Sequence, residues 1–134
     1  MINERLLFDN LNQRYKNVEL IQFENLDLIN ELYLLNNVAL FISSHGAGII
    51  SSFFIPEFST CIIINPKGFS FIYDFPTIYK TYLQRLNINV IQYENNSEED
   101  IVLKTIYENR DKNFYINIKK IKEIIDENVT ILYR

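Results

Sequence analysis

Residues 38–64, VALFISSHGAGIISSFFIPEFSTCIII, decide the fold expected for this chain. The segment 38–43 is apolar almost throughout instead of alternating, as is typical of a strand in a parallel sheet covered on both faces. The chain then turns at 45–48, HGAG, and enters a short apolar helix at 49–54 that ends before a proline. A second buried strand is predicted at 60–64. Strand, turn, helix and strand in this order form one unit of an α/β fold.

The rest of the chain continues this alternation of helices and strands. Apolar residues recur at helical spacing, as Leu7, Leu11 and Tyr15 do near the start of the chain. The pattern predicts further helices and strands at these positions: helices 4–16, 28–36, 76–86, 101–109 and 116–128, and strands 18–23 and 89–93. Because strands joined through helices pair in parallel with right-handed crossovers, we predict one α/β domain spanning 1–134. It is a Rossmann-like three-layer domain with a mostly parallel sheet of about four strands.

The composition is that of one globular domain. The chain has 134 residues, of which 48% are hydrophobic, enough to bury one sizeable core. A formal net charge of -4 leaves no broad positive face for a nucleic-acid backbone, so no nucleic-acid partner is expected. The single cysteine, Cys61, lies in an apolar run and is predicted to be a buried, inert thiol.

Neither a signal peptide nor a membrane span is expected from the sequence. Three of the first ten residues, MINERLLFDN, are charged where a signal peptide needs an apolar core. The most apolar stretch, 49–64, is interrupted by a Pro-Glu pair and is shorter than a transmembrane helix. A cytoplasmic location is therefore the prediction.

The HGAG turn is the part of the sequence that carries chemistry. It follows a predicted buried strand and precedes a helix, and ligands of open parallel sheets bind beyond the carboxyl ends of the strands. Gly46 and Gly48 have no side chain, so backbone amides at the helix start can approach an anion closely, and the helix dipole adds positive charge there. A diphosphate is the predicted ligand, although a glycine-rich turn of this kind can also exist for tight packing alone.

Several side chains around the turn can add hydrogen bonds to a bound phosphate. His45 is the only histidine of the chain and can donate from its imidazole, while Ser43, Ser44 and Ser51 can donate from hydroxyl groups. The predicted substrate-binding residues are Ser44, His45, Gly46, Ala47, Gly48 and Ser51. No residue is identified as a catalytic base.

Other chemistries do not fit the residues. One histidine and one cysteine cannot make the usual zinc site, and the carboxylates show no metal-loop spacing, so neither a metal nor a cofactor is predicted. Ala47 stands where a nucleophile elbow needs a serine, and the turn lacks the lysine of a P-loop. Tyr73 is a further candidate, as an aromatic ring that could stack on a base.

The stretch 39–66, ALFISSHGAGIISSFFIPEFSTCIIINP, resembles the signature block of glycosyltransferase family 61. In that block a buried strand leads to H-G-A-G-L-T-N, a P-P-G-S turn and V-I-E-L-x-P. The resemblance extends over roughly residues 1–95, with HGAG as its sharpest part. It implies the C-terminal, donor-binding half of a GT-B type enzyme, a UDP-sugar donor, an acceptor glycan or protein, and inverting, metal-independent transfer. His45, Gly46, Ala47 and Gly48 then correspond to donor-phosphate residues.

The chain also departs from the family pattern. The family's Asn after the glycines is Ser51 here, its Gln in the preceding helix is Glu31, and its Glu before the last proline is Ile63. Glu31, like Tyr73, is a possible substrate-binding residue. Glu57 and Phe58 replace a Pro and a Gly. Because the resemblance includes no N-terminal half, a separate N-terminal glycosyltransferase domain is an expected partner. Two alternatives stay open: a non-catalytic partner domain with an apolar docking surface, and a flavodoxin-like module for a small phosphorylated ligand.

Overall fold

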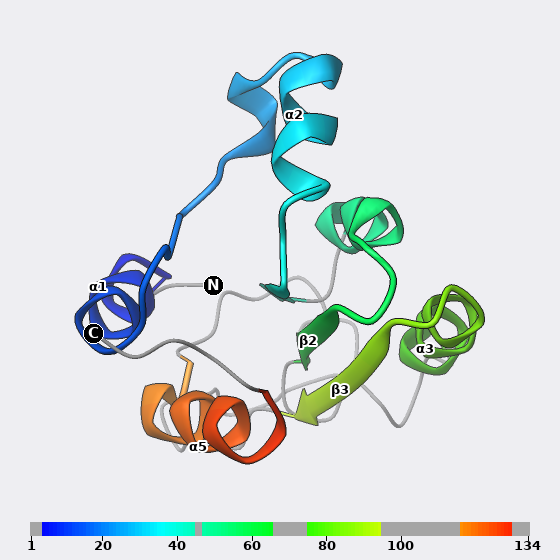
Figure 1. The fold of residues 1–134 in the computed structure, drawn as a ribbon. Coiled ribbons are helices and arrows are strands. Elements are labelled where there is room, and N and C mark those ends of the chain that lie inside the picture. The colour runs from blue at the N-terminus through cyan, green and yellow to red at the C-terminus, as the bar shows by residue number, and fades with distance from the viewer. Residues whose placement is uncertain (1–3, 45–46, 66–74, 95–115, 130–134) are drawn as a thin grey trace, which may run out of the picture.

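The computed structural model describes residues 4–44, 47–65, 75–94 and 116–129 (Figure 1). Its centre is an open sheet of parallel strands in the order β1-β2-β3, with these bounds: β1 (Leu40–Ser44), β2 (Thr60–Asn65) and β3 (Asn89–Glu94). In register, Leu40 of β1 lies opposite Thr60 of β2, which lies opposite Asn89 of β3. The predicted α/β, Rossmann-like class is confirmed.

Among the described residues, four α-helices and two 3-10 helices accompany the sheet: α1 (Glu4–Arg14), η1 (Phe23–Asn25), α2 (Leu28–Leu35), η2 (Ala47–Phe54), α3 (Phe75–Arg85) and α5 (Ile118–Asn128). The helices predicted within the described residues begin and end within two residues of the observed ones. The predicted helix at 49–54 is a 3-10 helix that starts two residues earlier, at the HGAG turn itself. The predicted helix at 101–109 lies outside the described residues.

Helices cover both faces of the sheet, so the domain has three layers. The central strand β2 is buried along its whole length. Ile62 and Ile64 pack with α1 and α5, whereas Cys61 and Ile63 pack on the opposite face with η2 and α3. Figure 1 shows α1 and α5 together on one side of the strands and α3 on the other. An uninterrupted apolar strand is what a sheet covered on two sides requires.

The predicted strand at 18–23 is wrong. Residues 18–22 form no strand, and Phe23 begins the short helix η1 instead. Figure 1 shows the reason: this segment leads away from α1 toward α2, which stands on the far side of the sheet, so it does not run beside β1. Its apolar residues fit an extended backbone, but a strand also needs a neighbour with which to pair. Within the described residues the sheet therefore has three strands instead of about four.

One polar contact joins α1 to α5 beside the apolar core. The Tyr15 hydroxyl, one residue beyond α1, donates a hydrogen bond of 2.6 Å to Asp126 Oδ1 of α5. Arg14 forms an ion pair with the other oxygen of the same carboxylate. These two helices hold one face of the sheet, so the contact ties the first and last described elements of the chain together.

Candidate functional site

The carboxyl edge of the sheet is formed by the last residues of three strands. Because Ser44 lies opposite Ile64, and Asn65 lies opposite Glu94, Ser44, Asn65 and Glu94 end their strands at the same edge. The chain leaves β1 at Ser44 and enters η2 at Ala47. The turn that the sequence singled out is therefore attached to the edge at which ligands of parallel sheets bind. His45 and Gly46 lie outside the described residues, as does Tyr73.

The first turn of η2 is fixed to the sheet by its apolar side chains. Ile49 is fully buried and packs with Ile63 of the central strand. The buried Ser52 hydroxyl donates to the Ile49 carbonyl, so its own polar group is satisfied locally. Near the start of a helix the backbone N–H groups have no partner within the helix, which is why such starts bind anions. In this chain that start is Ala47 and Gly48, two of the predicted binding residues.

The structure brings two of the predicted site residues into contact. Ser51 of η2 donates a hydrogen bond from Oγ to Glu31 Oε1 of α2, over 3.1 Å. A serine hydroxyl has only one proton to donate, so in this arrangement it serves Glu31 and leaves acceptor lone pairs for any ligand. The contact links α2 to the helix that begins at the HGAG turn. Glu31 itself, as a carboxylate, can accept a hydrogen bond from a ligand's hydroxyl or N–H group.

Sequence reasoning missed Asn65, which ends the central strand. It is only 2% exposed, and within the described part of the chain its side-chain oxygen Oδ1 accepts no hydrogen bond. Side chains alternate along a strand, so Asn65 shares the face of Cys61 and Ile63, which is the face covered by η2. The signal was a polar residue at the carboxyl end of an apolar run, where sheet ligands bind.

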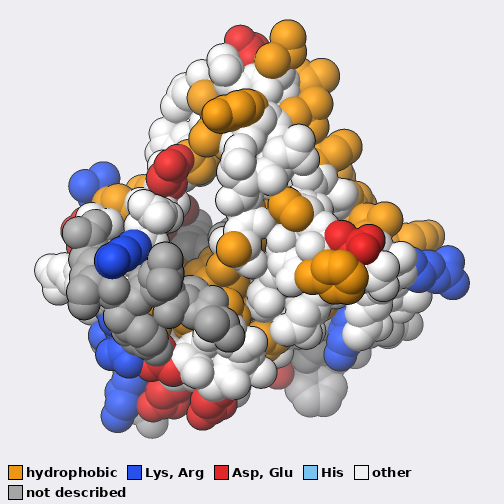
Figure 2. Space-filling model, in the orientation of Figure 1, with side chains coloured by type: hydrophobic (Ala, Val, Ile, Leu, Met, Phe, Trp, Pro, Cys, Tyr) orange, Lys and Arg blue, Asp and Glu red, His pale blue; other side chains and the backbone are white. Residues whose placement is uncertain are grey.

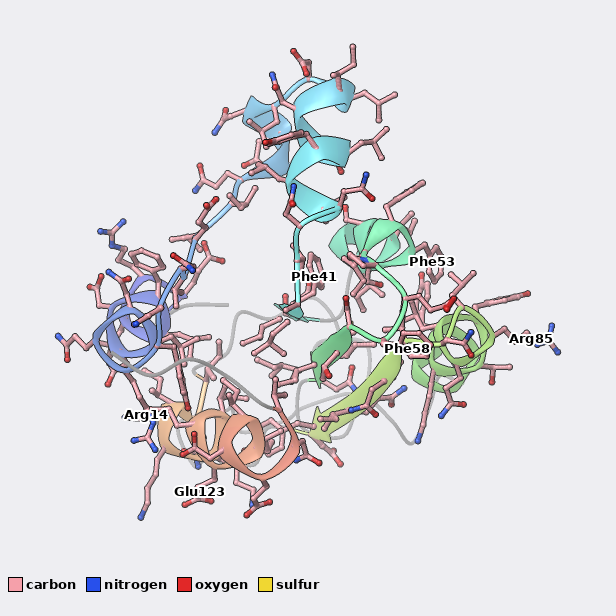
Figure 3. The ribbon with its side chains drawn as sticks, viewed as in Figure 1. Arg14, Phe41, Phe53, Phe58, Arg85 and Glu123 are labelled. Atoms are coloured by element: carbon pink, nitrogen blue, oxygen red, sulfur yellow. The ribbon has the colours of Figure 1, made fainter. Side chains whose placement is uncertain are left out.

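Two departures from the family pattern have clear structural consequences. Ile63, in place of the family's Glu, is fully buried against η2 and α3 and presents no polar atom. Phe58, in place of a Gly, has a left-handed backbone with φ of 69° and is 80% exposed. Figure 3 shows Phe58 on the turn between η2 and β2. This turn is at the amino end of the strand, away from the predicted site.

A shallow depression of about 450 Å³ lies at that amino end. It is lined by Asn36–Ala39, which lead into β1, and by Pro56–Ser59, which lead into β2. None of the predicted site residues lines it. The depression is therefore distinct from the HGAG turn.

Large apolar side chains are exposed along one side of the molecule. Figure 2 shows hydrophobic groups along α2 and on toward α3. The exposed members lie on α2, η2 and α3 or, for Leu86, one residue beyond α3: Leu28, Ile29, Tyr33, Ile50, Phe54, Tyr82 and Leu86. We call these residues the apolar face. Exposed apolar surface that extends over several elements is typical of contact with another protein.

Two features are absent from the described residues. Within 4–44, 47–65, 75–94 and 116–129, no group of three or more His, Cys, Asp and Glu residues could hold a metal ion. Of the helices in these ranges, none combines the length and the apolar character needed to cross a membrane.

The fold and its carboxyl-edge turn define the chain as a Rossmann-like α/β domain. Residues 1–63 match the model of the family Glycosyltransferase 61. This N-terminal part includes the HGAG turn and most of β2, and the match supports its assignment to glycosyltransferase family 61. The resemblance found in the sequence is thereby confirmed for this part. No curated protein matches the chain.

Proposed function

We propose that the chain is the donor-binding domain of a glycosyltransferase and that its HGAG turn holds the diphosphate of a UDP-sugar. The observation that carries this proposal is the place of the turn: it joins the carboxyl end of β1 to the start of η2, whose Ile49 is anchored on the sheet. The match of residues 1–63 to a glycosyltransferase family model supports a sugar donor and an acceptor. The domain in question is the whole span 1–134, with the fold of one half of a GT-B type enzyme.

The proposed chemistry is stabilisation of the leaving group. As the glycosidic bond to UDP breaks, negative charge grows on the diphosphate. In our proposal the backbone N–H groups of Gly46, Ala47 and Gly48 and the His45 imidazole donate hydrogen bonds to this charge. Ser44 precedes these residues in the chain and Ser51 follows them; Ser51 would have to release Glu31 in order to donate to the phosphate. Fixed donors of this kind lower the barrier because they need no rearrangement during the reaction. In the proposal these donors replace a divalent cation at the diphosphate, so the transfer needs no metal. That the transfer inverts the anomeric centre is what the family resemblance implies.

The acceptor and its base are supplied outside this domain in our proposal. The acceptor is a glycan or a protein, and the base that activates it lies on a separate N-terminal glycosyltransferase domain. Such a division agrees with the sequence, in which we identify phosphate-binding candidates but no base.

Isothermal titration with UDP and UDP-sugars tests the binding claim. We expect binding by the unaltered chain, and a loss of about tenfold or more in affinity for His45→Ala, since one hydrogen bond to a charged phosphate is removed. Asn36→Ala, at the depression on the opposite end of the sheet, is the matched control and should bind as the unaltered chain does. Absence of any heat with millimolar nucleotide would refute donor binding.

A second candidate is favoured by the apolar face. A non-catalytic partner domain that kept the fold and lost its chemistry was expected to show such a surface, and Figure 2 shows one. In this case the chain folds stably, binds no nucleotide and associates with the rest of a split glycosyltransferase. Light scattering, together with the titration above, separates the two candidates.

A further inference from the structure

The buried end of the central strand presents an unexplained polar atom. Asn65 Oδ1 is sealed from solvent and has no hydrogen-bond donor within the described part of the chain. An amide oxygen removed from water without a partner costs folding free energy, and leucine at the same place would carry no such cost. A residue that is unfavourable for the folded chain alone suggests that its partner arrives from outside.

The chemistry of this atom restricts the kind of partner. Amide Oδ1 is a hydrogen-bond acceptor, and the oxygens of an ionised diphosphate are acceptors as well, so the two cannot bond to each other. The partner must therefore be a hydroxyl or an N–H group. In a nucleoside diphosphate, such groups occur on the ribose and on the base.

The location of Asn65 agrees with a ligand at the HGAG turn. It is the last residue of β2, on the strand face covered by η2, next to the edge from which the 45–48 turn departs. Ile63, two residues earlier on this face, is apolar and fully buried. On this face of β2, Asn65 therefore supplies a hydrogen-bonding group at the carboxyl edge, whereas Ile63 does not.

We propose that Asn65 accepts a hydrogen bond from the nucleoside of the bound nucleotide, through a ribose hydroxyl. This inference rests on the proposed donor site, in which the HGAG turn binds the diphosphate and Asn65 binds the ribose attached to it. Asn65 is then a binding residue that selects ribonucleotides, and its oxygen is satisfied only in the complex.

The test compares two ligands on three proteins. UDP and 2′,3′-dideoxy-UDP are titrated into the unaltered chain, Asn65→Leu and Asn65→Asp. We expect the unaltered chain to prefer UDP by about tenfold, the value of one well-formed buried hydrogen bond. Asn65→Leu should lose this preference, whereas Asn65→Asp keeps an acceptor oxygen and should retain it. N3-methyl-UDP, which lacks the N–H of the base, should bind as UDP does.

Thermal melting without ligand gives an independent readout. Removing an unpartnered buried oxygen should leave the melting temperature of Asn65→Leu equal to or above that of the unaltered chain. A lower melting temperature, or a failure to fold, would show that the amide is bonded within the chain, and it would overturn the inference. Asn36→Leu, an exposed asparagine at the other end of the sheet, is the matched control.

The outcomes separate this inference from the proposed function. If UDP binds and Asn65→Leu still prefers UDP over 2′,3′-dideoxy-UDP, Asn65 does not bind the ribose hydroxyl, but the proposed donor site stands. If N3-methylation weakens binding through Asn65 instead, the ribose assignment is wrong. If the unaltered chain binds no nucleotide at all, the proposed donor site fails and this inference fails with it.

Discussion

Replacing Tyr15 by phenylalanine probes how α1 is held against α5. Tyr15 is 2% exposed, and its hydroxyl donates to Asp126 Oδ1 over 2.6 Å. A hydrogen bond to a charged acceptor contributes about 1.5–3 kcal/mol when it is well shielded. Because the Asp126 side chain is 28% exposed and keeps Arg14 as a partner, we expect Tyr15→Phe to lose about 1–2 kcal/mol of unfolding free energy at pH 7.

The same contact predicts a dependence on pH in the alkaline range. Burial, reinforced by the hydrogen bond to Asp126 and by its charge, raises the pKa of Tyr15 to about 12, against an ordinary value of 10.0. Between these two values the unfolded chain has lost the phenolic proton while the folded chain keeps it, so stability falls as pH rises. The fall amounts to about 2–3 kcal/mol over this window, at roughly 1.4 kcal/mol for each pH unit. Tyr15→Phe has no such proton to lose.

Urea unfolding followed by circular dichroism at pH 7, 10 and 11.5 measures this difference. The advantage of the unaltered chain over Tyr15→Phe should shrink above pH 10 and vanish or reverse by about pH 12. Tyr33→Phe is the matched control, because Tyr33 is 70% exposed, and it should leave the stability at pH 7 unchanged. Equal pH profiles for the unaltered chain and Tyr15→Phe would refute the reasoning.

Three further predictions concern single residues. Phe58→Gly should raise the melting temperature by a few degrees, because the steric strain that glycine relieves at this left-handed backbone exceeds the conformational entropy that glycine costs. Asn87→Gly should raise it less, because asparagine tolerates its φ of 57°. Equal rises in melting temperature would contradict this account. Asp27→Ala should cost about 1 kcal/mol of stability in urea unfolding, because the Asp27 carboxylate caps α2 by accepting from the Asn30 N–H over 2.8 Å; an unchanged midpoint would argue against the cap. Burial raises the pKa of the Cys61 thiol to about 11. Thiol reagents at pH 8 should therefore react with it only as fast as the chain unfolds. Rapid labelling of the folded chain would show that Cys61 is accessible.

The order of elements could be predicted because its signals are local. The uninterrupted apolar run that ends at Ile64 is buried on both faces, as a central parallel strand is. Asp27, a residue type that favours helix N-caps, directly precedes the predicted helix 28–36, and its side chain caps α2. Helical spacing placed Leu7 and Leu11 on a buried face, where they are found.

The errors and omissions concern contacts between distant segments. The apolar residues of 18–23 fit a strand, but pairing depends on where α1 and α2 direct the segment, and this is a property of the whole fold. Glu31 and Ser51 were noticed separately, and only the packing of α2 beside η2 shows that they share a hydrogen bond. Asn65 carries no motif, and its buried, unpartnered oxygen appears only once the sheet is built.

A crystal structure of the chain with UDP tests the central claim most directly. The account predicts the diphosphate against the backbone of residues 45–48, at the carboxyl edge of β1, with the ribose toward Asn65. A nucleotide bound elsewhere, for example in the depression lined by Asn36–Ala39 and Pro56–Ser59, would contradict it.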